Sequence, residues 1–120
     1  MLHYQVKSLL DMGPQAEFLG RGAPFPGFDA LVADNVAIDG VTFSVGDLVF
    51  CNTKPGKVVA CVKEDDDFFL VIDALALYER LSTHSGIYAF DGRRVVWGAR
   101  KVSLALAWRS HPRGVTVIFN

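Results

Sequence analysis

Cysteine is scarce in this chain of 120 residues, which has only Cys51 and Cys61. A small secreted scaffold held together by disulfides would usually carry four or more cysteines, so that class is disfavoured. No apolar run approaches the ~18 residues needed to cross a bilayer. Residues 1–7 lack a basic segment followed by an apolar stretch, so no signal peptide is visible. A soluble, intracellular protein with no membrane partner is therefore the expectation.

The sequence also lacks the motifs of common catalytic and metal-binding sites. Its histidines, His3, His84 and His111, are far apart, and nine residues separate Cys51 from Cys61. A zinc knuckle would place about two to four residues between its cysteines. No P-loop, serine elbow or dinucleotide-binding loop occurs. We therefore predict no metal site and no cofactor, and enzyme chemistry has no positive support.

Acidic residues cluster at positions 64–67, which read Glu-Asp-Asp-Asp. A calcium loop would alternate its ligands and carry a glycine near its middle, and this run does neither. The run instead predicts a solvated β-turn, which keeps a sheet edge from pairing with other chains.

Charge is unevenly distributed along the chain, although the formal net charge is only −1. Residues 86–120 hold six basic residues against one acidic residue, a net +5, whereas residues 1–85 hold six against twelve, a net −6. Such asymmetry is typical of a basic face for an anionic partner, of an acidic part that folds onto a basic part, or of subunits that dock head to tail.

Hydrophobic residues make up 51% of the chain and charged residues 21%, which is enough apolar material for a core. The length is that of one domain, so residues 1–120 are expected to form a single unit. Within it, residues 36–120 would form a β core. Residues 1–35 are richer in glycine and proline and would form an ordered arm or an oligomer contact. The candidate interface residues in this arm are Phe18, Phe25 and Phe28.

Turn signals between apolar arms predict four hairpins. Asp39-Gly40 and Asp91-Gly92 are the strongest, because a type I′ turn needs positive φ at both central residues. Residues 111–114, His-Pro-Arg-Gly, predict a four-residue turn near the end of the chain. Residues 53–56, Thr-Lys-Pro-Gly, predict another. The leading fold prediction is therefore mainly β, a small antiparallel barrel or sandwich of hairpins.

The hairpin over residues 46–63 decides whether the cysteines can pair. With residues 53–56 as its loop, Asn52 faces Lys57 and Cys51 faces Val58. Cys61 then projects from the opposite face, since side chains alternate with period two. Two reduced, largely buried thiols are therefore expected.

Residues 68–72 form a continuous apolar run that fits a strand covered on both faces. The next segment, residues 73–81, either continues this strand or forms a short helix capped by Asp73, and the helix is slightly favoured. Residues 82–86 read as a loop. Residues 4–10 fit a strand or a short helix.

Aromatic residues gather in the predicted hairpin around Asp91-Gly92. In that register Phe90 faces Arg93, Tyr88 faces Val95, and Gly86 faces Trp97. Rings on one face of a hairpin form core in most proteins. Partly exposed, they would make a cage for a methylated ammonium, or stack nucleic-acid bases beside the arginines. The candidate binding residues are Tyr88, Phe90, Trp97, Arg93 and Arg94.

Three segments resemble the opening strands of SH3-like barrels of the Tudor, PWWP, KOW and bromo-adjacent-homology modules. These are residues 45–50 with the pattern "GD-V", residues 56–62, which begin with Gly-Lys-Val, and the apolar residues 68–72. The resemblance covers roughly residues 41–80, extending to about 110 for the bromo-adjacent-homology type, and does not include the arm. It implies a small barrel that binds a peptide, a modified tail or nucleic acid without catalysis.

Three functional hypotheses follow. The first is a non-catalytic binding module for a peptide, a modified tail or nucleic acid. The second is a self-associating protein, a homo-oligomer with a ligand groove between subunits. The third is a small thiol-dependent enzyme that uses Cys51 or Cys61 with a histidine or an acid.

Overall fold

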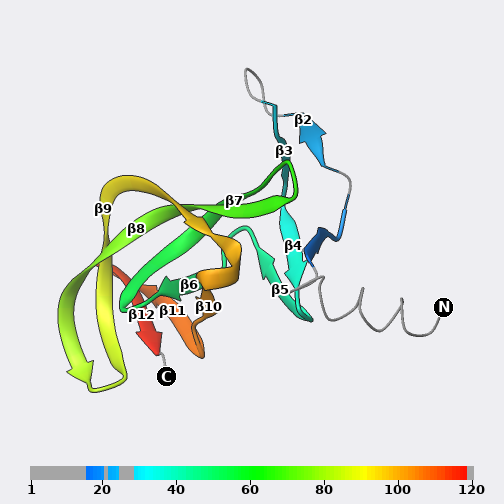
Figure 1. Ribbon diagram of the computed structural model, residues 1–120. Coiled ribbons are helices and arrows are strands. Elements are labelled where there is room, and N and C mark those ends of the chain that lie inside the picture. The colour runs from blue at the N-terminus through cyan, green and yellow to red at the C-terminus, as the bar shows by residue number, and fades with distance from the viewer. Residues whose placement is uncertain (1–15, 21, 25–28, 119–120) are drawn as a thin grey trace.

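The computed structural model of the protein describes residues 16–20, 22–24 and 29–118, which form antiparallel strands and one short 3-10 helix (Figure 1). The strands are β1 (Ala16–Phe18), β2 (Ala23–Pro24), β3 (Leu31–Ala33), β4 (Asn35–Ile38), β5 (Val41–Ser44), β6 (Leu48–Cys51), β7 (Lys54–Glu64), β8 (Asp67–Ser82), β9 (Ser85–Gly98), β10 (Ser103–Leu104), β11 (Ala107–His111) and β12 (Gly114–Ile118), with η1 (Ala99–Lys101) as the 3-10 helix. The mainly β prediction is confirmed. No α-helix occurs in these ranges, and none of their residues belongs to a helix long and apolar enough to cross a membrane.

The strands form two antiparallel sheets. The large sheet has the order β10-β6-β7-β8-β9-β12-β11, and β3, which itself pairs with β2, joins it along β7. The small sheet has the order β1-β4-β5 and packs against β7 (Figure 1). No closed barrel is formed by the described strands.

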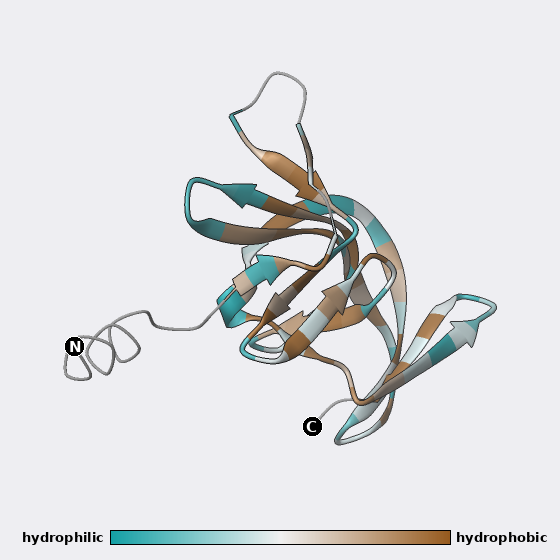
Figure 2. Cartoon of the chain, turned by 90° about the vertical axis from the view of Figure 1, so that its right-hand side faces the viewer, coloured by the Kyte–Doolittle hydropathy of each residue, from teal (hydrophilic) through white to brown (hydrophobic). Residues whose placement is uncertain are grey.

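Buried side chains gather in two hydrophobic clusters. The first lies where the small sheet meets the large one, and its buried members are Val36, Ile38, Phe43, Val49, Val58, Cys61, Leu70, Ile72, Ala99 and Val102. The second lies under the other end of the large sheet and consists of Leu48, Leu75, Tyr88, Val115 and Val117. Figure 2 shows the complementary pattern, with hydrophilic residues concentrated at the turns.

The Asp39-Gly40 hairpin is confirmed. Ile38 pairs with Val41, and the two residues between them have φ values of 50° and 80°. Positive φ at both positions is what a type I′ turn requires.

The second predicted aspartate–glycine hairpin is wrong, because β9 continues through Asp91 and Gly92 without reversing. Arg94 pairs with Asp73 and Phe90 pairs with Leu75, so residues 91–93 oppose Ala74 alone and form a bulge. Gly92 has a φ of 81°, and the Asp91 carboxylate accepts a hydrogen bond of 2.9 Å from the backbone N–H of Arg93. The local geometry of the dipeptide is thus used for a bulge rather than a reversal.

The hairpin between β6 and β7 is confirmed, but its predicted loop and register are wrong. Cys51 pairs with Lys54, so the turn consists of Asn52 and Thr53, with a φ of 59° at Asn52. Pro55 and Gly56 therefore lie in β7 rather than in the loop. Both cysteines are free thiols, and Cys61 is buried.

The acidic run forms the β7–β8 turn as expected, with Glu64 paired to Asp67. From there β8 continues to Ser82, so the favoured helix over residues 73–81 is wrong. From Asp73 to Arg80 the chain pairs with β9, with irregularities at Ala74 and Tyr78, and this cross-strand pairing overrides the modest helix propensity of the segment. The expected loop at residues 82–86 shrinks to the two-residue turn between Ser82 and Ser85.

The last hairpin is confirmed with a shorter turn, because His111 pairs with Gly114. The segment before it connects the two ends of the large sheet. The Ala105 N–H donates to the Leu48 carbonyl of β6 at 2.9 Å, and the Leu106 N–H donates to the Ile118 carbonyl of β12 at 2.9 Å.

The described part of the arm is ordered and pairs with the core. β1 pairs with β4, and β3 pairs with β7. The Phe18 ring contacts the Phe68 ring edge to face, with centroids 5.4 Å apart. Phe18 therefore makes a packing contact within its own chain. Phe25, Phe28 and residues 4–10 lie outside the described residues.

Candidate binding site

The aromatic face predicted around Asp91-Gly92 does not form, because the hairpin that would create it is absent. On β9 the Tyr88 ring belongs to the second buried cluster, and Trp97 packs against the first. Tyr88 pairs with Leu77 and Trp97 with Leu70, at opposite ends of the β8–β9 ladder. The predicted residues are thus divided between separate parts of the molecule.

Three of the predicted residues do share a hollow, which we call the bulge pocket. Phe90, Arg93 and Arg94 line it together with Asp73, and its volume is about 260 Å³. Phe90 is half exposed there. Phe90, Arg93 and Arg94 all lie on β9. They line the same pocket because the bulge at residues 91–93 bends this strand.

Both arginines of the bulge pocket are engaged by carboxylates. Arg93 Nε lies 3.1 Å from Asp91, and Arg94 Nε lies 2.8 Å from Asp73. The hydrogen bond from the Arg93 backbone N–H is the main reason why the pKa of Asp91 lies below its ordinary value. Asp73 in the pocket wall and Asp91 beside the pocket thus offset the charge of both arginines, so the bulge pocket has little attraction for an anionic ligand.

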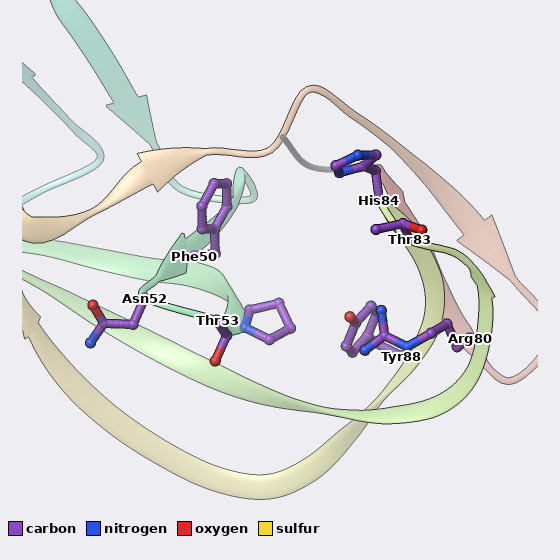
Figure 3. Close-up of a pocket in the computed structure, with 8 residues that line it drawn as sticks. Phe50, Asn52, Thr53, Arg80, Thr83, His84 and Tyr88 are labelled. Atoms are coloured by element: carbon purple, nitrogen blue, oxygen red, sulfur yellow. The ribbon is translucent and has the colours of Figure 1, made fainter.

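A second hollow lies between the β6–β7 hairpin and the far end of the β8–β9 hairpin, and we call it the basic pocket. Its volume is about 300 Å³. Figure 3 shows Phe50 on the β6 side, with Arg80 and Tyr88 together on the opposite side. Its lining residues are Phe50, Asn52, Thr53, Pro55, Arg80, Thr83, His84 and Tyr88.

Turn geometry places the polar residues of the basic pocket. Asn52 occupies the left-handed region, which asparagine tolerates better than most residues, and it closes the two-residue turn beside Phe50. Thr83 and His84 form the turn between β8 and β9. A serine pair steadies that turn, since the hydroxyls of Ser82 and Ser85 are 2.6 Å apart.

Gly86 makes room for the aromatic wall of the basic pocket. A Cβ on Gly86 would stand 3.1 Å from Cε2 of Tyr88 and 3.1 Å from Cδ1 of Leu77. Without it, the Tyr88 ring lies close against the β9 backbone. Arg80 pairs with Gly86 across the ladder, which brings its side chain beside the same ring.

The electrostatic character of the basic pocket is positive. Arg80 lines it and makes no ion pair with another described residue, and the lining residues within the described ranges include no carboxylate. Burial raises the pKa of Tyr88, and the positive charge of Arg80 only partly opposes this. The phenol therefore stays protonated and neutral near pH 7, so its oxygen carries no negative charge that would repel an anion.

Among the described residues, Cys61 is poorly suited to act as a nucleophile. Burial raises the pKa of the Cys61 thiol to about 11, with Asp34 and Asp47 adding to the effect, and a protonated thiol is a poor nucleophile. No group of three or more His, Cys, Asp or Glu side chains in these ranges is arranged to hold a metal ion. What the basic pocket provides is an aromatic surface, hydrogen-bonding groups and positive charge, which suit binding.

Of the residues of the basic pocket, sequence reasoning named only Tyr88 as a candidate binding residue. The others lie in or near the turns of two different hairpins. The pattern of residues along one sequence does not indicate that these two turns face one another. Residues 82–86 were recognised as a loop, but nothing linked them to Phe50. Comparison with known protein families, with curated proteins and with solved structures finds no match for this chain.

Proposed function

We propose that this protein is a non-catalytic binding module for nucleic acid and that the basic pocket is its contact site. The observation that carries the proposal is the combination of the Phe50 ring with the Arg80 guanidinium in a pocket whose described lining residues include no carboxylate. Nucleic-acid strands present flat bases and phosphates, and proteins bind them with aromatic rings and cations.

The alternative ligands fit the basic pocket less well. A methylated ammonium needs several exposed rings and no competing cation. Here Arg80 would repel it, and the Tyr88 side chain is only 5% exposed. An acidic peptide would use the cation but would gain little from the Phe50 ring. A nucleic-acid strand uses both.

The strand order supports an SH3-like architecture as part of this proposal. β6, β7, β8 and β9 follow one another as antiparallel neighbours, and after η1 the chain returns to pair β10 with β6. This succession covers the segments that resemble SH3-like barrels. The likeness supports only the architecture, because a fold does not by itself determine a function.

The proposal is tested by titrating the protein into a fluorescein-labelled, mixed-sequence single-stranded 12-mer and following the anisotropy. Affinity should fall as salt is raised, because binding to phosphates releases counterions. Arg80→Ala should weaken binding about fivefold and reduce the salt slope by about one unit. Arg109→Ala is the matched control, since this exposed arginine lies on β11 and does not line the pocket.

Two results would contradict the proposal. One is the absence of binding by the native protein at low salt. The other is an equal loss of affinity in Arg80→Ala and Arg109→Ala, which would assign the interaction to diffuse charge rather than to the basic pocket.

Self-association is a second candidate, favoured by the apolar residues exposed on the distal half of β8. Leu77, Tyr78 and Leu81 are each about half exposed. Arg113 covers one side of Tyr78, with its guanidinium carbon 5.0 Å from the ring centroid. Light scattering after size exclusion tests this candidate, and a monomer at micromolar concentration would eliminate it.

A further inference from the structure

We propose that the basic pocket accepts a single unpaired base, so that the protein selects single-stranded over double-stranded nucleic acid. This inference rests on the proposed function and specifies the form of its ligand. It follows from the size of the pocket, from its position between two turns, and from the chemistry of its walls.

The size of the pocket limits what can enter it. Its volume of about 300 Å³ lies at the lower end of the range for small-ligand sites. That is room for one nucleoside unit, not for several stacked bases. A strand bound here would therefore place one unit in the pocket and continue over the surface on either side.

The position of the pocket requires that the base leave its stack. Its two sides are the Asn52-Thr53 turn and the Thr83-His84 turn, and these belong to separate hairpins. A base can reach the space between them only if it extends from the backbone. Bases in a duplex are paired and stacked, so extrusion of one costs free energy that a single strand does not pay.

The walls of the pocket suit an extruded base. The half-buried Phe50 ring forms one side, and a base can stack on it whatever its sequence. The Asn52 amide and the Thr53 and Thr83 hydroxyls each donate and accept hydrogen bonds, so they accommodate different base edges. Arg80 lies opposite Phe50, where it is suited to neutralise the phosphate of the inserted unit (Figure 3).

The test compares two fluorescein-labelled ligands in the same buffer, a mixed-sequence single-stranded 12-mer and a blunt 12-base-pair duplex of the same sequence. We expect the single strand to bind the native protein at least tenfold more tightly. Phe50→Leu, which keeps an apolar side chain but removes the aromatic ring, should weaken single-strand binding about tenfold and leave duplex binding unchanged.

Phe90→Leu is the matched control, because Phe90 is a half-exposed ring of β9 that lines the bulge pocket instead. It should leave the affinity for both ligands unchanged. Thermal melts of both variants show whether they fold. Phe50→Trp keeps an aromatic ring at the same position and should retain single-strand binding, which separates stacking from a general packing defect.

Failure of this inference differs from failure of the proposed function. Equal affinity for single strand and duplex, with Phe50→Leu matching the native protein, would overturn base insertion while leaving nucleic-acid binding in place. No binding of either ligand would overturn both.

Discussion

Replacing Gly56 by alanine tests the packing at the centre of the large sheet. Gly56 is buried on β7, and a Cβ added there would collide with Cγ2 of Ile72. The same Cβ would stand 3.2 Å from the Asp73 carbonyl oxygen and 3.4 Å from Cη2 of Trp97. Ile72 is fully buried, so its side chain has no open space into which it can turn.

The magnitude follows from two opposing effects. Overpacking a closely packed core costs about 1–3 kcal/mol. Alanine also lowers the conformational entropy of the unfolded chain relative to glycine, which stabilises the folded protein by about 0.4–1 kcal/mol. The net expectation is a loss of about 1–2 kcal/mol in the free energy of unfolding, or a Tm lower by about 4–8 °C for a chain of this size.

Urea denaturation followed by tryptophan fluorescence measures this difference. Gly98→Ala is the matched control, because Gly98 also lies in a strand, has ordinary extended backbone, and would have no heavy atom within 4 Å of its added Cβ. It should be neutral or slightly stabilising. If Gly56→Ala is as stable as Gly98→Ala, then β7 and β8 do not pack in the register described.

Two further predictions concern titratable groups. Because burial raises the pKa of Cys61 from 9.0 to about 11, folded protein binds this proton more tightly than unfolded protein, so the free energy of unfolding should fall by about 2–3 kcal/mol as the pH rises from 9 to 11. Cys61→Ala should lack that part of the fall in pH-dependent urea melts, and an identical profile would contradict the assignment. The Asp91 carboxylate, titrated by NMR, should show a midpoint below 3.8, so its stabilising contribution is present above that pH and is lost as the pH falls through the lowered midpoint. Arg93→Ala should restore the pKa only in part, since the main hydrogen bond comes from the Arg93 backbone, and complete restoration would show that the guanidinium dominates.

Parts of the fold were predictable because their causes are local. Asp39-Gly40 forms its turn because both residues adopt positive φ readily and the apolar alternation on either side agrees with the pairing. The acidic residues at 64–67 form a turn for a similar reason, since closely spaced carboxylates favour solvent. The succession of hairpins over residues 36–118 follows from such signals.

The basic pocket was not predicted as a unit, because the contacts that form it are not local. Phe50, Arg80 and Tyr88 come from three strands, and only the folded sheet brings them to one pocket. The predicted common face of Tyr88, Phe90 and Trp97 does not form, because it depended on a reversal at Asp91-Gly92 that does not occur. Because the register of this hairpin was counted from that turn, the error at the turn gave a wrong cross-strand partner for every residue in it.

The sequence by itself determined that this chain folds into antiparallel hairpins, because alternating apolar residues and turn residues act within a few positions of one another. Tertiary structure alone decided how the second aspartate–glycine pair is used. Asp39-Gly40 ends a strand because the chain reverses to pair with itself, whereas Asp91-Gly92 lies within β9 because Phe90 and Arg94 both pair with β8. The same two residue types therefore make a turn or a bulge according to the neighbouring strand available for pairing.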